Sequence, residues 1–146
     1  MKDLPHLYRV TAEAKSATNL TVRADNLPDI SVAPPTQFGG PGDQWSPEDL
    51  FMASIANCLV LSFKAIARAS KLQWDNIECE SEGELDKVDR KVKFTNVLSK
   101  VKLSIPTTEN KDKAERLLHK AEETCLISNS ISCESHIECE IVVSDE

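Results

Sequence analysis

The stretch LFMASIANCLVLSFKAIA, residues 50–67, is by far the most apolar run in a chain of 146 residues of which 28% are charged. The letters before it predict that a helix begins near Ser46, because Ser46 can cap, Pro47 suits the first helical position and Asp49 completes a capping-box pattern. We expect this helix to run to about Ser70. Its apolar residues cover nearly the whole circumference, which is typical of a membrane span or of a fully buried core helix.

Polar residues within the run favour the core helix over the membrane span. Ser54, Asn57, Ser62 and Lys64 interrupt it, and a helix that crosses a bilayer needs about 20 predominantly apolar residues. The first ten residues contain no apolar stretch of signal-peptide length, so we expect a cytoplasmic protein without a membrane partner. The net charge of −7 opposes non-specific attachment to nucleic acid, and we expect no nucleic-acid partner.

The remaining sequence predicts short strands, then two long ones, then a helix and a closing strand, within a single domain that covers residues 1–146. Alternating apolar residues predict strands over 7–14, 20–23 and 29–32, and we expect these three strands to form a small antiparallel sheet. Further strands are expected over 76–86, 90–106 and 131–143, and an amphipathic helix over 110–125. The apolar phase changes within the strand at 90–106, which predicts a β-bulge near Thr95–Asn96.

The five cysteines are odd in number and contain no CxxC pair, so we expect at least one free thiol and no disulfide framework. Cys79, Cys133 and Cys139 share apolar strand faces and are interpreted as small hydrophobic residues. The spacing Cys133-x-x-His136-x-x-Cys139 resembles that of a metal site, but residues three apart on a strand point to opposite faces, and we expect no metal there. Spacing alone also favours a structural role for the two remaining cysteines, Cys58 and Cys125, although each lies on a helix at a junction or core seam.

Two other motifs carry no prediction of chemistry. His119 lies beside the apolar stripe of the helix at 110–125 and is interpreted as a surface histidine. The loop FGGPGDQW, residues 38–45, lacks the Lys-Ser/Thr of a phosphate loop and is interpreted as a connector.

Together, FGGPGDQWSPEDLFMASIANC at 38–58 and AEETCLISNSI at 121–131 resemble the OsmC/Ohr family of thiol-dependent peroxide reductases. The resemblance implies an α+β fold with antiparallel sheets packed around a long buried central helix, in an intertwined homodimer. It also implies that Cys58 is the peroxidatic cysteine and Cys125 the resolving cysteine, that Glu48 supports the site, that organic hydroperoxides are the substrates, and that no cofactor is needed. An external dithiol would reduce the resulting disulfide.

The family's peroxidases use an arginine from the N-terminal sheet to activate the first cysteine, and this sequence departs from that pattern. The arginine is expected near 15–18, where none occurs, so we predict that Arg23 supplies the cation, with Arg9 and Lys15 as the alternatives. Leu126 also replaces the proline that commonly follows the second cysteine. A non-catalytic relative in which Cys58 senses redox state or binds a ligand is an alternative, and a dimeric scaffold is a third.

Overall fold

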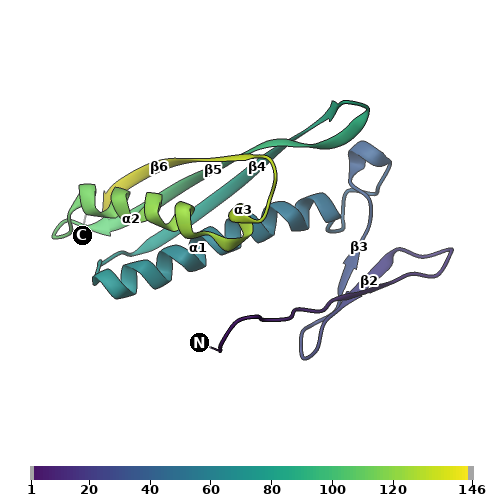
Figure 1. The fold of residues 1–146 in the computed structure, drawn as a ribbon, viewed down its shortest axis with the longest axis horizontal. Coiled ribbons are helices and arrows are strands. Elements are labelled where there is room, and N and C mark those ends of the chain that lie inside the picture. Colours follow the sequence, from purple (N-terminus) through teal and green to yellow (C-terminus); the bar gives the residue numbers. More distant parts are fainter. Residues whose placement is uncertain (1, 145–146) are drawn as a thin grey trace. The chain divides into compact units, whose positions relative to one another are not determined.

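The computed structural model describes residues 2–144, which form two compact units that divide between Phe51 and Met52 (Figure 1). The first unit contains a three-stranded antiparallel sheet in the order β1-β2-β3, as predicted. Its strands are β1 (Thr11–Glu13), β2 (Leu20–Arg23) and β3 (Ile30–Val32). The prediction of a single domain over the whole chain stays a prediction.

The first strand is shorter than its alternating sequence predicts. Tyr8 and Val10 precede β1 and are 86% and 66% exposed, so the apolar members of the alternation are not covered by this unit. After β3 a short 3-10 helix, η1 (Thr36–Phe38), leads into the glycine pair. Gly40 is required there, because a Cβ atom at this position would collide with the carbonyl of Pro34.

Helix α1 (Pro47–Ser70) begins and ends where the sequence predicts. The Ser46 hydroxyl accepts a hydrogen bond from the Asp49 N–H at 3.0 Å, and the Asp49 carboxylate accepts from the Ser46 N–H at 3.3 Å, which is the reciprocal pattern of a capping box. Its residues at intervals of four are buried in the protein core: Ile55, Leu59, Phe63 and Ala67.

The opposite side of α1 is more exposed than its all-apolar sequence predicts. Leu61 is 64% exposed, and only 22% of the most apolar window of α1 is buried. By length and composition α1 could cross a membrane, but its buried stripe packs as a core helix does. Within the single chain, burial is therefore confined to one face of the helix.

The second unit is built on a three-stranded sheet in the order β4-β5-β6. The strands are β4 (Asn76–Val88), β5 (Lys91–Pro106) and β6 (Glu134–Ser144). β4 and β5 are antiparallel, and their register shifts where Glu84 faces Asn96 but Leu85 faces Phe94. Thr95 is thus the extra residue, which confirms the predicted bulge.

The pairing of the last strand corrects the expectation of purely antiparallel sheets. β6 lies parallel to β5, with Val101 facing Cys139. The connection between the two strands carries α2 (Lys111–Thr124) and α3 (Leu126–Asn129), and a crossover of this length permits parallel pairing. The α+β class itself is confirmed.

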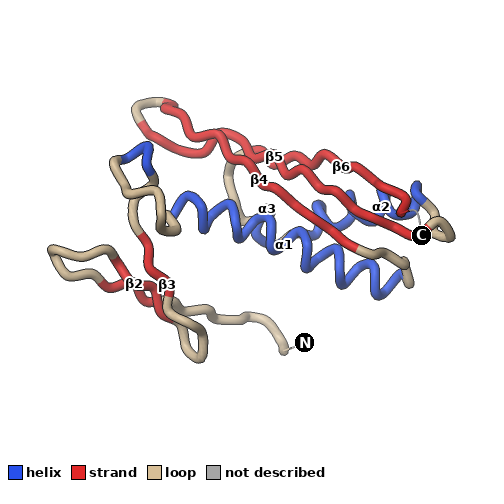
Figure 2. The backbone as a smooth tube through the Cα atoms, turned by 180° about the vertical axis from the view of Figure 1, so that it is seen from behind, coloured by secondary structure: helices blue, strands red, loops and turns tan. Residues whose placement is uncertain are grey.

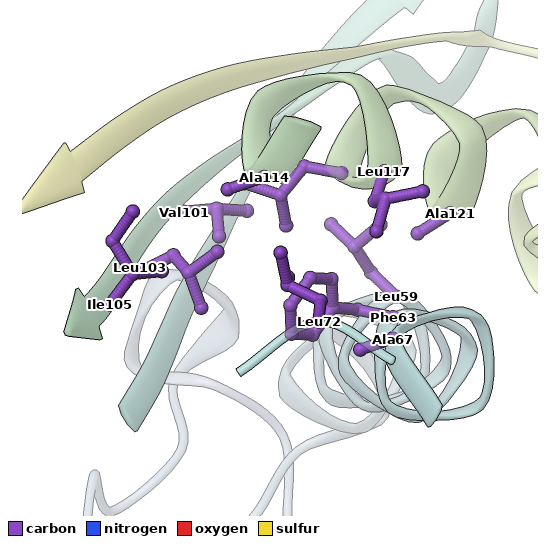
Figure 3. Close-up of a cluster of buried hydrophobic side chains, with 11 residues drawn as sticks. Leu59, Phe63, Ala67, Leu72, Val101, Leu103, Ile105, Ala114, Leu117 and Ala121 are labelled. Atoms are coloured by element: carbon purple, nitrogen blue, oxygen red, sulfur yellow. The ribbon is translucent and has the colours of Figure 1, made fainter. Parts of the chain in front are cut away.

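The core of the second unit lies between its helices and the sheet. Both α1 and α2 run along the same face of β4-β5-β6 in two opposite views (Figures 1 and 2). Side chains from α1, α2 and β5 meet there, with Leu59 and Phe63 facing Val101 and Leu117 (Figure 3). This packing fixes the middle of α1 against the end of α2, where the two cysteines of interest lie.

Candidate active site

The structure brings Cys58 and Cys125 together, and both lie in the second unit. Cys58 is in the middle of α1, whereas Cys125 joins two helices. The backbone of Cys125 is extended (φ −67°, ψ 107°), which ends α2, and its carbonyl then accepts the N–H of Asn129 at 3.0 Å to begin α3. Each thiol is among the groups that shift the pKa of the other, so the two side chains are neighbours. Cys58 is half-buried and Cys125 is fully buried.

Several donors surround the sulfur of Cys58. Burial alone would raise the pKa of this thiol, but hydrogen bonds from the Ile127 main chain, the Cys125 thiol, the Ser62 hydroxyl and the Leu126 main chain outweigh it and lower the pKa. The Ser62 oxygen lies 4.0 Å from the Cys58 sulfur, one helical turn further along α1. Cys58 is therefore the thiol of the pair that more readily becomes a thiolate.

Cys125 is shifted in the opposite direction. Burial raises the pKa of its thiol, and the adjacent Cys58 raises it further, while the Ser128 hydroxyl, which donates to the Cys125 sulfur at 3.4 Å, opposes the shift. Because the pKa of Cys58 is lowered and that of Cys125 is raised, the pair loses its first proton from Cys58, while Cys125 stays protonated beside the thiolate. Such an arrangement gives one nucleophilic thiolate and one protonated thiol that is less reactive.

The other three cysteines are also free thiols. Cys79 and Cys139 pack against the core on the inner face of the sheet, as predicted. Burial raises the pKa of both, that of Cys139 to about 11. Cys133 is half-buried just before β6.

The histidines take the positions that the sequence predicts for surface residues. His136 is on the exposed face of β6, opposite the face of Cys139, and lies 3.3 Å from the Glu134 carboxylate. His119 is exposed on α2 and lies 4.0 Å from Glu115. Among residues 2–144 no group of three or more His, Cys, Asp or Glu side chains is arranged to hold a metal ion.

Glu48 is the second residue of α1 and lies in the first unit. Its side chain is half-buried, and its Oε1 atom is buried without a hydrogen-bond partner among the residues that the structure describes. A cavity of about 280 Å³ adjoins it, and the rest of its lining is apolar. The lining comprises Leu20, Ala33, Pro34, Pro35, Phe38, Pro47 and Glu48. A carboxylate in such surroundings calls for a cationic or hydrogen-bonding partner.

The predicted cation is already paired within its own unit. Arg23, at the end of β2, lies 3.0 Å from the Glu13 carboxylate of β1, and both side chains are largely exposed. Of the two alternatives, Lys15 is exposed in the turn after β1, where its backbone N–H donates to the Thr18 hydroxyl at 3.2 Å. Arg9 is exposed before β1. The assignment of the cation stays a prediction.

The donors around Cys58 were not among the residues predicted from the sequence. Ser62 carried a usable signal, since a residue four positions after a helical cysteine lies on the same face. The main-chain groups of Leu126 and Ile127 carried none, because every residue except proline has an N–H group.

The sequence matches a known protein family. The family model of the OsmC-like protein matches residues 40–140. The uncharacterized protein YmaD of Bacillus subtilis is 24% identical over 126 residues, which cover 84% of this chain and 83% of YmaD.

Solved structures resemble nearly the whole chain. An OsmC-like protein of unknown function from Vibrio cholerae, VCA0330, has a TM-score of 0.82 at 21% identity and covers 94% of this chain and 100% of its own. An organic hydroperoxide resistance protein OsmC from Legionella pneumophila has a TM-score of 0.73 at 29% identity, with coverage of 95% and 100%.

Proposed function

Because this chain belongs to the OsmC-like protein family, we propose that it is a thiol-dependent peroxidase that reduces organic hydroperoxides, with Cys58 as the peroxidatic and Cys125 as the resolving cysteine. One feature carries the proposal: two neighbouring thiols whose pKa values are shifted in opposite directions. The name of the Legionella protein, at 29% identity, supports the substrate class.

The reaction that we propose uses each thiol once. The Cys58 thiolate attacks the outer oxygen of the hydroperoxide, the O–O bond breaks, and the alkoxide leaves and takes a proton from solvent. Cys58 is then a sulfenic acid. The Cys125 sulfur attacks it, a disulfide forms, and the sulfenic hydroxyl leaves with the thiol proton as water. The substrate gains two electrons, and an external dithiol restores the two thiols by exchange.

The unequal exposure of the two cysteines suits these roles. Cys58 is half-buried and can meet a substrate, whereas Cys125 is fully buried and out of reach of one. A buried, protonated Cys125 is protected from direct oxidation, because the thiolate is the reactive form. Its contact with Cys58 allows it to intercept the sulfenic acid before a second peroxide does.

Glu48 and the cation belong to this proposal as supporting groups. We assign Glu48 the task of holding a guanidinium, since its buried Oε1 has no hydrogen-bond partner within residues 2–144. Arg23 is the proposed guanidinium, and it would have to exchange its exposed pairing with Glu13 for one with Glu48. Exposed ion pairs of that kind contribute about 1 kcal/mol or less, so the exchange is inexpensive.

We also propose that the protein acts as a homodimer in the cytoplasm. The apolar face of α1 that includes the 64% exposed Leu61 favours coverage by a second copy of the chain. The reaction as written needs neither a bound cofactor nor a metal. Its partners are the hydroperoxide, the dithiol and the second subunit.

The test compares three variants in peroxide consumption driven by dithiothreitol, with an organic hydroperoxide and hydrogen peroxide as substrates. Cys58→Ser should abolish turnover, whereas Cys125→Ser should react once and then accumulate oxidised Cys58. Cys133→Ser, which removes a thiol outside the pair, is the control and should retain turnover. After one equivalent of hydroperoxide, peptide mapping of the wild type should join residues 58 and 125.

Two outcomes would contradict the proposal. Unchanged turnover in Cys58→Ser would remove the assigned nucleophile. Stoichiometric thiol loss without turnover in the wild type would instead favour a redox-sensing protein.

A further inference from the structure

A serine hydroxyl lies beside the buried thiol of Cys125. Oγ of Ser128 donates a hydrogen bond to the sulfur of Cys125, and the two atoms are 3.4 Å apart. Cys125 is 0% exposed, so water does not solvate this sulfur. A charge that develops on a buried atom needs donors from the protein, because burial removes those of the solvent. The Ser128 hydroxyl is such a donor.

Other hydrogen bonds hold the segment after Cys125 in place. The Asn129 N–H donates to the carbonyl of Cys125 at 3.0 Å, and the Ser130 hydroxyl donates to the carbonyl of Leu126 at 2.7 Å. The Ser128 hydroxyl is bonded instead to the sulfur that the proposed function assigns to the resolving step. Its contact therefore concerns the thiol more than the shape of the turn.

The neighbours of Cys125 oppose a negative charge on its sulfur. The thiols of Cys58 on α1 and Cys79 on β4 are the titratable groups that interact with it. Burial and Cys58 raise the pKa of Cys125, and the Ser128 hydroxyl is the largest of the influences that lower it. Without this hydroxyl, Cys125 would form a thiolate less readily.

Access makes Cys125 the sulfur that leaves when the disulfide is reduced. In thiol–disulfide exchange a thiolate attacks one sulfur and the other sulfur leaves. Cys58 is half-buried and Cys125 is fully buried, so the attack falls on Cys58. Cys125 has the higher pKa of the two and is therefore the poorer leaving group. A donor on its sulfur has its greatest effect at this step.

We propose that the Ser128 hydroxyl stabilises the negative charge that develops on the Cys125 sulfur, both when this sulfur attacks the sulfenic acid of Cys58 and when it leaves the disulfide. The inference deepens the proposed function and rests on its assignment of Cys125 as the resolving cysteine. In the reduction, a thiolate of the dithiol bonds to the Cys58 sulfur and the S–S bond breaks. Its electron pair goes to Cys125, which then takes a proton from solvent. The second thiol of the reductant attacks the reductant's own sulfur in the mixed disulfide and releases Cys58, which completes the transfer of two electrons.

Reduction of the disulfide by dithiothreitol tests the proposal without peroxide. Diamide oxidises the protein, peptide mapping confirms the bond between residues 58 and 125, and quenched samples give the rate of its reduction. A hydrogen bond to a charged acceptor changes its equilibrium by about ten- to a hundredfold, and exchange rates follow roughly half of such a change in free energy. Ser128→Ala should therefore slow the reduction about three- to tenfold, and Ser128→Thr, which keeps the hydroxyl, should restore the wild-type rate.

Ser130→Ala is the matched control. It removes a hydroxyl from the same segment, but one that is bonded to a main-chain carbonyl rather than to a sulfur, so the wild-type rate is expected. Equal slowing in Ser130→Ala and Ser128→Ala would show that only the segment had loosened, and this would overturn the proposal. A wild-type rate in Ser128→Ala, with circular dichroism unchanged, would overturn it as well.

Should Ser128→Ala fail to fold, the pair Ser128→Thr and Ser128→Val decides instead, because both side chains are β-branched and only threonine carries a hydroxyl. Slower reduction in Ser128→Val supports the proposal, and equal rates refute it. None of these measurements needs peroxide turnover. A wild type that consumes no hydroperoxide but shows the expected rates would refute the proposed function and leave the role of Ser128 in thiol exchange intact.

Discussion

Gly83 of β4 lies against Met52 of α1, and replacing it by alanine tests how α1 packs on the sheet. A Cβ atom at residue 83 would lie 2.8 Å from both the Sδ and Cε atoms of Met52 and 2.9 Å from Cδ1 of Phe94. Contacts this short do not persist, so a side chain must move. Met52 lies six residues before Cys58 on α1, and its displacement would loosen the helix next to the cysteine pair.

The expected cost follows from two opposing terms. Overpacking a filled contact by one methyl group costs about 1–3 kcal/mol. The loss of the backbone freedom of glycine in the unfolded chain returns roughly 0.5–1 kcal/mol. Gly83→Ala should therefore lower the free energy of unfolding by about 1–2 kcal/mol. The flexible end of Met52 can absorb part of the strain, and the less mobile ring of Phe94 cannot absorb it as easily.

A double-mutant cycle with Met52→Ala isolates this contact. In the Met52→Ala background the added methyl group no longer meets the Sδ and Cε atoms of residue 52, so Gly83→Ala should cost about 1 kcal/mol less there than in the wild type. Urea unfolding at one fixed protein concentration measures both effects, with the m value as a check on two-state behaviour. Costs that agree within about 0.3 kcal/mol in the two backgrounds would refute the packing of Met52 over Gly83.

Two further predictions concern the sheet. Deletion of Thr95 should leave a folded protein with a circular dichroism spectrum like that of the wild type, because only the bulge residue is lost and Phe94 and Val97 stay on the same face of β5. Deletion of Lys100 should prevent folding, because it moves the side chains of one half of β5 to the opposite face of the sheet. The free energy of unfolding should also fall as pH rises between about 9 and 11, because the unfolded chain loses the Cys139 proton near the ordinary pKa of 9.0 while the native state keeps it up to about 11. Cys139→Ala should make this fall shallower, and an unchanged slope would show that the thiol titrates normally.

The elements whose signals are local could be predicted from the sequence. The limits of α1 follow from Ser46, Pro47 and Asp49, which act within one turn, and the bulge at Thr95 follows from a change of phase within one strand. The direction of β6 could not be predicted from the sequence, because apolar and polar residues alternate in the same way in parallel and antiparallel strands. Whether β6 runs parallel to β5 depends on where the connection between the two strands crosses the sheet. Tyr8 and Val10 alternate as a strand would, yet β1 begins after them, so alternation alone did not fix where pairing starts.

The candidate site could be predicted only in part, and for a different reason. Spacing gave Cys58 and Cys125 no preference over three other cysteines on apolar faces, and their pairing came from a family resemblance. Their opposite pKa shifts depend on burial and on main-chain groups 68 and 69 residues away from Cys58 in sequence, at Leu126 and Ile127. No side-chain pattern reports such contacts, because the donors are common to nearly all residues.

The proposed cation, Arg23, can be tested by its effect on the Cys58 thiolate. Arg23→Ala should slow Cys58 alkylation at neutral pH, and the rate should recover at high pH, because loss of a cation that stabilises the thiolate raises the pKa of the thiol. If Arg23→Ala alone leaves the profile unchanged, Arg9→Ala and Lys15→Ala are the next tests for the cation. Should none of the three change it, Cys58 would be activated without any of these cations, and the departure from the family pattern near 15–18 would have no substitute at positions 9, 15 or 23.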